Sequence, residues 1–242
     1  MSRIYVVGIG PGDESMMTHQ AMDALRESDV IIGYRSYTDL VKERFPGKEI
    51  IESSMRQERE RCRKCIELAA AGRTVALICS GDAGVYGMAS PLIEEAAKRG
   101  YDDIVIVPGV TAALSGAAML GAPIGHDFCT ISLSDLLTPW EIIEKRLRLA
   151  AEADFCIAIY NPASRGRADY LKRACDVLLE LLPPDRVCGY AKNIGRSESS
   201  RMICTLSELA GIDAGMSVTV FVGNSMTYSD GKRMITPRGY RQ

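Results

Sequence analysis

The start of the chain joins a short apolar run to a glycine-rich turn: Ile4–Val7 is followed by Gly8-Ile9-Gly10-Pro11-Gly12-Asp13. A strand that ends in such a turn is typical of an α/β fold, in which the fingerprint G-x-G-x-x-G holds a pyrophosphate at a helix N-terminus. Gly8 and Gly10 fit the fingerprint, but Asp13 replaces its third glycine and would put a carboxylate where the phosphate should lie. The turn is therefore not expected to bind a dinucleotide, and another function must explain its glycines.

Apolar runs alternate with amphipathic segments along the whole chain. We expect strands over residues 4–7, 30–32, 50–51, 74–79, 104–107, 129–133, 155–160, 187–191 and 217–222. We expect helices over residues 14–27, 55–71, 90–99, 111–120, 139–153 and 168–182, and a short one that begins at 205–209. Continuous apolar strands between helices indicate a parallel sheet that is covered on both faces. The break at Gly121-Ala122-Pro123 then predicts two α/β domains, 1–121 and 122–242.

The composition excludes several classes of partner. The net charge is −2, so no basic field favours nucleic acid or an anionic membrane surface. Apolar stretches are too short to reach the roughly 20 residues that cross a bilayer. Without a leader-like apolar segment at the start, a cytoplasmic location is the expectation.

Eight cysteines include one C-x-x-C pair, Cys62 and Cys65, on an expected helix. A zinc or iron–sulfur site needs four ligands, and neither a second such pair nor a nearby histidine is present. We therefore expect reduced thiols and no metal, while a redox or metal role of this pair stays open.

Seven loops that carry glycine, aspartate or asparagine follow the expected strands. In open α/β sheets ligands bind beyond the carboxyl ends of strands, so we expect these loops to line a cleft that both domains share. Within Gly81–Gly87, three glycines would let a ligand approach the backbone, and Asp82 either binds that ligand or caps the following turn. The loops cover residues 8–13, 80–87, 108–112, 133–135, 160–167, 192–195 and 223–225.

Three ordered motifs give the chain a family resemblance. V-G-I-G-P-G-D at the start, S-G-D-A-G-V-Y-G from Ser80 and P-G-V-T-A-A from Pro108 resemble the tetrapyrrole (precorrin) methyltransferase family. Leu133–Trp140, Tyr160-Asn161-Pro162 and Ser164-Arg165 resemble one branch in particular. Members of that branch methylate C17 of precorrin-3B or cobalt-factor III, with ring contraction, in cobalamin synthesis.

The resemblance implies two α/β domains with the active site in the cleft between them. It also implies S-adenosylmethionine as cofactor, with S-adenosylhomocysteine as product. The residues that would contact the cofactor are Pro11, Ser80, Gly81, Asp82, Val85, Thr111, Ala112, Asn161, Lys192 and Asn193. Gly10 and Gly12 would lie at the floor of a trough for the tetrapyrrole substrate.

Ring contraction needs proton transfer, for which we expect Asp13 and Asp135, with Ser134 as a hydrogen-bonding partner. The alternative for Asp13 is an N-cap of the helix that begins at Glu14. The substrate carries many carboxylates, which arginine binds with paired hydrogen bonds. Arg35 and Arg165 are the expected ligands; Arg56, Arg59 and Arg167 are further candidates, whereas Arg61 and Arg63 fit a solvated helix face.

Two other functions keep the same fold. One is an enzyme with another acceptor, such as a different precorrin position, a diphthamide precursor or ribosomal RNA. The other is a module that binds adenosylmethionine without turnover. Members of the family are commonly homodimers, and we expect the same here.

Overall fold

The computed structural model describes residues 2–164 and 166–240, and it divides into two compact units, residues 1–112 and 113–242. The first unit is built on a parallel sheet with the strand order β3-β2-β4-β1-β5. Its strands are β1 (Ile4–Gly8), β2 (Val30–Tyr34), β3 (Glu49–Ser53), β4 (Val75–Cys79) and β5 (Ile104–Val107). Because all five run in the same direction, their carboxyl ends lie along one edge.

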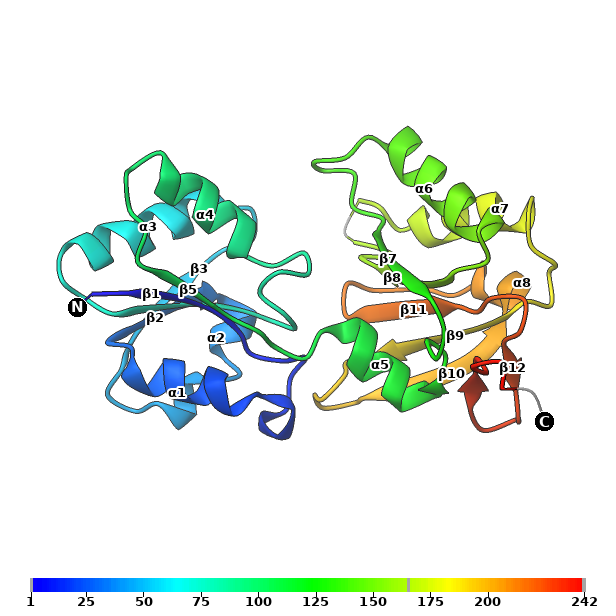
Figure 1. Cartoon of the computed structure of the whole chain (residues 1–242), viewed down its shortest axis with the longest axis horizontal. Helices are drawn as coiled ribbons and strands as arrows, with labels where there is room; N and C mark the ends of the chain where they lie inside the picture. Colours follow the sequence, from blue (N-terminus) through cyan, green and yellow to red (C-terminus); the bar gives the residue numbers. More distant parts are fainter. Residues whose placement is uncertain (1, 165, 241–242) are drawn as a thin grey trace. The chain divides into compact units, whose positions relative to one another are not determined.

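Helices cover both faces of this sheet, as Figure 1 shows for α3 and α4 on one side and α1 on the other. Every residue of β4 is buried, which explains its unbroken apolar sequence. The helical segments of this unit are η1 (Glu14–Met16), α1 (His19–Glu27), α2 (Arg35–Thr38), η2 (Lys42–Arg44), α3 (Glu58–Ala70) and α4 (Ala89–Ala97).

The helix expected over residues 14–27 is two segments. A single 3₁₀ turn, η1, comes first, and α1 begins only at His19, where the Thr18 side chain accepts the backbone N–H of Ala21. Threonine is a favoured N-cap, and it sets the start of the longer helix.

The second unit has a mixed sheet with the strand order β10-β9-β11-β8-β7. β7 and β8 are parallel, whereas β11 runs antiparallel to both β8 and β9. The strands are β7 (Phe128–Ser132), β8 (Cys156–Tyr160), β9 (Val187–Lys192), β10 (Ser200–Thr205) and β11 (Val218–Val222). A smaller sheet joins β12 (Tyr228–Ser229), β13 (Met234–Ile235) and β6 (Gly121–Ala122).

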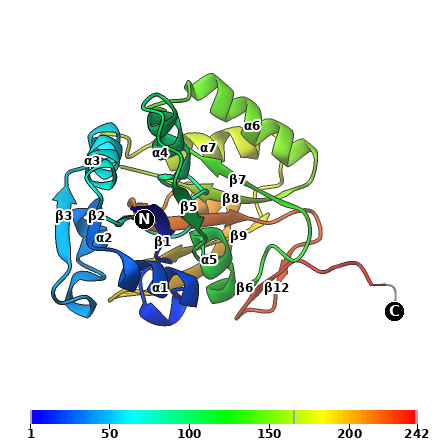
Figure 2. The same ribbon diagram turned by 60° about the vertical axis from the view of Figure 1, so that its left-hand side comes forward.

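Two cores lie on the two faces of this mixed sheet. Figures 1 and 2 show α6 (Trp140–Glu152) and α7 (Tyr170–Leu179) together on one face, where α8 (Leu206–Leu209) joins them. On the other face, α5 (Ala112–Leu120) packs Ala117 and Leu120 against Phe221. The units therefore divide after Ala112, before the Gly121-Ala122-Pro123 break where the sequence places a boundary, because α5 belongs to this second core.

Among the described residues, no helix is long and apolar enough to cross a bilayer.

Candidate active site

Three glycines meet at the strand-end edge of the first sheet. Gly8 ends β1, and Gly81 and Gly109 lie two residues beyond β4 and β5. A Cβ on Gly109 would lie 2.1 Å from the carbonyl oxygen of Gly81 and 2.5 Å from that of Gly8. No side chain fits at such distances, so the backbones of the three loops lie in direct contact.

The first and second motifs are joined backbone to backbone. The Gly10 N–H donates to the Gly81 carbonyl at 3.1 Å, and the Gly81 N–H donates back to the Gly10 carbonyl at 2.7 Å. Both glycines are left-handed, with φ near +73° and +71°, which glycine adopts at no steric cost. The Ser80 hydroxyl also donates to the Gly10 carbonyl, at 3.5 Å, and Pro11 is buried beside this bridge.

Asp82 holds two of these loops together. Its Oδ1 accepts the backbone N–H groups of Gly84 and Val85, at 2.8 and 3.1 Å, and its Oδ2 accepts that of Gly109 at 2.9 Å. The capping alternative therefore describes these contacts, and the bond to Gly109 extends the cap to the β5 loop.

Thr111 and Ala112 complete this edge. A Cβ on Gly81 would lie 3.7 Å from the Thr111 Cα and 3.8 Å from the Ala112 nitrogen, so the β5 loop lies against the β4 loop. The structure thus brings together the cofactor residues that the sequence predicts in the first unit, which are Pro11, Ser80, Gly81, Asp82, Val85, Thr111 and Ala112.

Asp13 is an N-cap, as the alternative predicts, although it caps only the 3₁₀ turn η1. Its carboxylate accepts the Ser15 hydroxyl at 2.6 Å and the Ser15 backbone N–H at 2.8 Å. These two bonds hold the pKa of the Asp13 carboxyl below its ordinary value. The exposed carboxylate therefore stays ionised at neutral pH.

Two asparagines mark the corresponding edge of the second sheet. Asn161 follows β8 and Asn193 follows β9, and both are left-handed, with φ of +53° and +51°. Asn161 donates from its side chain to the Ser132 hydroxyl at 2.9 Å, which ties β8 to the end of β7. Lys192 is exposed at the end of β9. A non-glycine residue in this conformation is strained, and such strain gathers at functional sites.

Asp135 lies in a hydrogen-bonded cluster with Arg167 and Tyr170. Arg167 donates to the Ser134 hydroxyl at 2.9 Å and to Asp135 at 3.2 Å, and the Tyr170 hydroxyl donates to the other Asp135 oxygen. The bond from Tyr170, with help from Arg167, holds the pKa of the Asp135 carboxyl below its ordinary value. Asp135 and Ser134 are therefore neighbours, and Asp135 is ionised at neutral pH.

One of the seven predicted loops lies at the wrong edge. Because β11 runs antiparallel to β8 and β9, the turn at 223–225 lies with the starts of β7, β8 and β9. Ser225 there donates its backbone N–H to Asp154, which precedes β8. The start of β11 takes its place at the Asn161 edge, where the Ser217 carbonyl accepts the Asn193 backbone N–H at 3.1 Å.

Comparison with known proteins assigns these loops to a family. The sequence matches the family described as Tetrapyrrole (Corrin/Porphyrin) Methylases over residues 3–210. The chain belongs to the tetrapyrrole methylase family.

Three curated tetrapyrrole methylase relatives match nearly the whole chain. A probable cobalt-factor III C(17)-methyltransferase of Salmonella typhimurium is 48% identical over 236 residues, which cover 97% of this chain and 98% of that protein. A precorrin-3B C(17)-methyltransferase of Sinorhizobium sp is 39% identical, and the match covers 98% of this chain and 96% of that protein. A cobalt-factor III methyltransferase of Priestia megaterium is 42% identical, and this chain spans 45% of that longer protein.

Solved tetrapyrrole methylase structures share the fold. The methyltransferase CobJ superposes with a TM-score of 0.90 at 38% identity, over 98% of this chain and 100% of that chain. A uroporphyrin-III C-methyl transferase from Thermus thermophilus, complexed with S-adenosylhomocysteine, has a TM-score of 0.72 at 23% identity. The superposition covers 92% of this chain and 97% of that chain.

The arginines considered as substrate ligands of this tetrapyrrole methylase lie in different surroundings. Arg165 lies outside the described residues. Arg35 begins α2, is 75% exposed and lies in a pocket at the ends of β2 and β3. Arg61, expected on a solvated face, is instead 6% exposed and donates to Ser53 and Ser54.

Sequence reasoning missed Tyr170 and the burial of Arg61. Tyr170 begins α7, where the sequence reads as an ordinary amphipathic helix. Arg61 lies among interleaved charges, but it is one position before Cys62 on α3, so the same helix face that buries Cys62 and Cys65 extends to it. This spacing is the sequence signal from which the burial of Arg61 could have been predicted.

Cys62 and Cys65 lie in the core between α3 and the sheet. Burial raises the pKa of the Cys62 thiol to about 11 and that of Cys65 further. In the part of the chain that the structure describes, no three histidine, cysteine, aspartate or glutamate side chains gather into a possible metal site.

Proposed function

We propose that this protein is an S-adenosylmethionine-dependent methyltransferase that methylates C17 of precorrin-3B or cobalt-factor III, with ring contraction, in cobalamin synthesis. The observation that carries the proposal is 48% identity, across 97% of the chain, to a relative named for this activity on cobalt-factor III. The Sinorhizobium relative named for precorrin-3B supports the same carbon position.

The strand-end loops of the first unit fit adenosylmethionine. That molecule carries an amino group, a carboxylate and a nucleoside, and binding it requires closely spaced donors and acceptors. The contacts among Gly8, Gly81 and Gly109 leave backbone rather than side chains at this edge. Ser80 and Thr111 add hydroxyl groups there. We propose that Pro11, Ser80, Gly81, Val85, Thr111 and Ala112 contact the cofactor, with Asp82 holding their loops in register.

Asn161, Lys192 and Asn193 are proposed cofactor contacts on the second unit. Both asparagines bring a polar side chain to this edge, and the Asn161 side chain is held in place by its bond to Ser132. When bound, adenosylmethionine supplies an electrophilic methyl group. The residues of this chain contribute by orienting the partners and excluding water, which suffices for a transfer in which the substrate carbon is the nucleophile.

Ring contraction also requires protons to move. We propose Asp13 and Asp135 for this step, with Ser134 as a hydrogen-bonding partner and Gly10 and Gly12 at the trough floor. Because both carboxyls have a lowered pKa, each would accept a proton rather than donate one. Asp135 has Tyr170 and Arg167 in place to stabilise its charge.

The alternative is the same chemistry on another acceptor. A different precorrin position or a diphthamide precursor would leave the cofactor residues unchanged, and ribosomal RNA would call for a broad basic surface. The net charge of −2 does not favour RNA. A homodimer and a cytoplasmic location are proposed with the main function.

The deciding experiment incubates the enzyme and adenosylmethionine with precorrin-3B and, separately, with cobalt-factor III. We expect one of the two to gain a methyl group and to yield the ring-contracted product, as read by mass spectrometry and NMR. Binding of adenosylmethionine with no methylation of either substrate would favour another acceptor. Binding of NAD without adenosylmethionine would overturn the proposal.

A further inference from the structure

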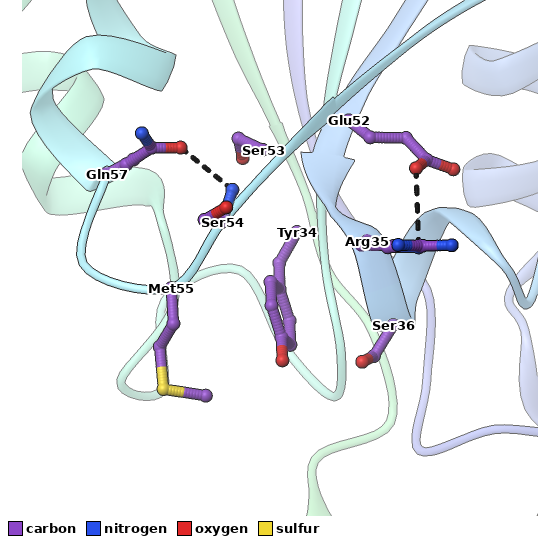
Figure 3. A pocket seen from close by; sticks show the side chains of 8 residues that line it. All are labelled: Tyr34, Arg35, Ser36, Glu52, Ser53, Ser54, Met55 and Gln57. Atoms are coloured by element: carbon purple, nitrogen blue, oxygen red, sulfur yellow. Dashed lines mark hydrogen bonds and ion pairs between the residues drawn. The ribbon is translucent and has the colours of Figure 1, made fainter.

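A pocket of about 450 Å³ opens at the carboxyl ends of β2 and β3. The two strands are in parallel register, with Tyr34 paired to Ser53, so the residues that follow each strand form opposite walls. Arg35 and Ser36 begin α2 on one side, and Ser54, Met55 and Gln57 lead into α3 on the other (Figure 3). The pocket therefore lies on the same sheet edge as the glycine loops of β1, β4 and β5.

The pocket combines apolar and cationic side chains. In Figure 3 the Tyr34 ring and the Met55 side chain extend in the same direction, and Ser36 lies on the opposite side of the ring from Met55. The Arg35 Nε is 3.7 Å from a Glu52 oxygen, a long and mostly exposed ion pair. Glu52 also accepts from Thr38 at 3.3 Å and lies 3.9 Å from Lys42, so its charge is shared and Arg35 keeps donors for a ligand.

Behind one wall lies the buried side chain of Arg61. Its Nε donates to the Ser53 hydroxyl at 2.6 Å, and its terminal nitrogens donate to the Ser54 carbonyl at 3.2 Å and to the Met88 sulfur at 3.6 Å. The Ser53 hydroxyl in turn donates to the Gly33 carbonyl at 3.0 Å, which leaves its lone pair for Arg61. Arg61 therefore fixes the Ser53–Ser54 wall.

All three acceptors of Arg61 are uncharged. Among the described residues, no carboxylate lies within ion-pair distance of this guanidinium, although it is only 6% exposed. A buried charge without an opposite charge is costly, and buried arginines are normally paired. A bound anion on the other side of the Ser53–Ser54 wall would supply the missing charge.

We propose that this pocket binds a carboxylate side chain of the tetrapyrrole substrate, with Arg35 as its direct ligand and Arg61 as a positioning residue that adds positive potential from behind. The inference rests on the proposed function and names one subsite of it. A short acid side chain matches the lining, because Tyr34 and Met55 would contact its methylene groups and Arg35 its carboxylate.

The test measures binding rather than turnover. Uroporphyrin, which carries a carboxylate on every peripheral side chain, is titrated by absorbance into wild type and Arg35→Gln, with its methyl ester as the uncharged probe. We expect Arg35→Gln to raise the Kd for uroporphyrin about tenfold, with no change for the ester. Arg26→Gln is the matched control, because Arg26 is an exposed arginine of the same unit that is paired with Asp23; its Kd should match wild type.

Arg61→Met tests the buried charge. We expect a Kd for uroporphyrin raised at least about threefold and a weaker dependence of that Kd on salt, since one cation is removed. Arg61→Lys, which keeps the charge, should retain most of the affinity and also covers the case in which the methionine variant fails to fold. A Kd for uroporphyrin in Arg35→Gln equal to that of wild type would overturn the proposal, and so would a folded Arg61→Met variant with an unchanged Kd and an unaltered salt dependence.

Adenosylmethionine titration separates the two possible sources of a carboxylate. Its Kd should be the same in wild type and Arg35→Gln; a higher Kd for the cofactor alone would mean that the pocket holds the cofactor carboxylate and would overturn the proposal. If wild type methylates neither precorrin-3B nor cobalt-factor III but the uroporphyrin results hold, the subsite stands and the proposed acceptor fails.

Discussion

Asp82, Asp13 and Asp135 each accept hydrogen bonds from groups of their own unit. Asp82 holds backbone N–H groups of two loops, Asp13 holds both polar groups of Ser15, and Asp135 holds Tyr170 and Arg167. These bonds fix the position of each carboxylate, and they hold the pKa of Asp13 and of Asp135 below the ordinary value. Any chemical role must therefore be compatible with a carboxylate that is already oriented.

Replacing Asp82 with Asn should weaken adenosylmethionine binding and the fold together. One amide oxygen can replace one carboxylate oxygen, but the amide nitrogen cannot accept the Gly109 N–H, which leaves that donor unpaired at a cost of about 1–3 kcal/mol. Urea unfolding and calorimetric titration measure the two effects. Unchanged cofactor affinity would remove Asp82 from the cofactor site.

Replacing Asp13 with Asn should keep the cap, because asparagine caps helix starts as well as aspartate does. Cofactor affinity should be unchanged and turnover slower, since the proton acceptor is lost. The pKa of Asp13 is lowered, so its carboxylate is ionised at every pH above the ordinary aspartate pKa of about 3.9. The wild-type rate should therefore show no loss from this group between roughly pH 5 and 9. Normal turnover in the variant would leave Asp13 as a cap only.

Single residues could be predicted from sequence where backbone geometry demands a residue type. The glycines and the Asp13 cap are of this kind. The burial of Arg61 was missed, because interleaved charges mask a position whose burial depends on what packs against α3. Asp135 was predicted, but its bond to Tyr170 joins residues 35 positions apart, which no local pattern reveals.

At the scale of elements, the glycine contacts at the ends of β1, β4 and β5 pack three loops directly against one another. Each loop alone would be an ordinary strand end. The close approach of Gly8, Gly81 and Gly109 means that a change in one loop displaces the other two.

Gly109→Ala should therefore disturb all three loops. Its Cβ would meet two carbonyl oxygens at 2.5 Å or less, and forced overpacking of this kind costs about 1–3 kcal/mol. We expect a lower unfolding midpoint in urea and weaker adenosylmethionine binding. Gly215→Ala is the control, because nothing lies within 4 Å of its Cβ position. Equal midpoints for the two variants would contradict the packing argument.

In the first unit, β1, β2 and β4 followed from sequence because each is an apolar run that is mostly buried. Only the two isoleucines of β3 were predicted, because Glu49 and Glu52 of that strand are exposed. β10 did not follow from sequence, because it begins Ser200-Arg201 and its first three residues are exposed. The direction of β11 is also invisible locally, since an apolar strand reads the same whether its neighbours run parallel or antiparallel. That is why sequence reasoning placed the turn at 223–225 at the same edge as Asn161 and Asn193.

At the scale of the whole molecule, the eight cysteines are all free and six of them are buried. Burial raises the pKa of Cys62, Cys79, Cys129 and Cys204 to about 11 and that of Cys175 to about 12. Thiolate is the reactive form, so these side chains are protonated under ordinary assay conditions.

The thiols of the native protein at pH 8 should therefore react slowly with a disulfide reagent such as dithionitrobenzoate. In protein unfolded in guanidinium, all eight thiols should react rapidly. A raised pKa means less thiolate at any pH below it, so the native rate should increase as pH rises toward 10. Rapid native-state reaction of more thiols than the two half-buried ones, Cys129 and Cys204, would contradict the burial of the other six.

The reversed direction of β11 leaves one exposed methionine near each end of the strand, at opposite edges of the second sheet. Met216 is exposed just before β11, beside the Asn193 edge, and Met226 is exposed just after it, at the far edge. Each can be changed to cysteine and labelled selectively, because the native thiols are buried or poorly ionised. If the Asn193 edge contacts adenosylmethionine as proposed, the emission of a dye at Met216 should change on binding, whereas the same dye at Met226 should not respond.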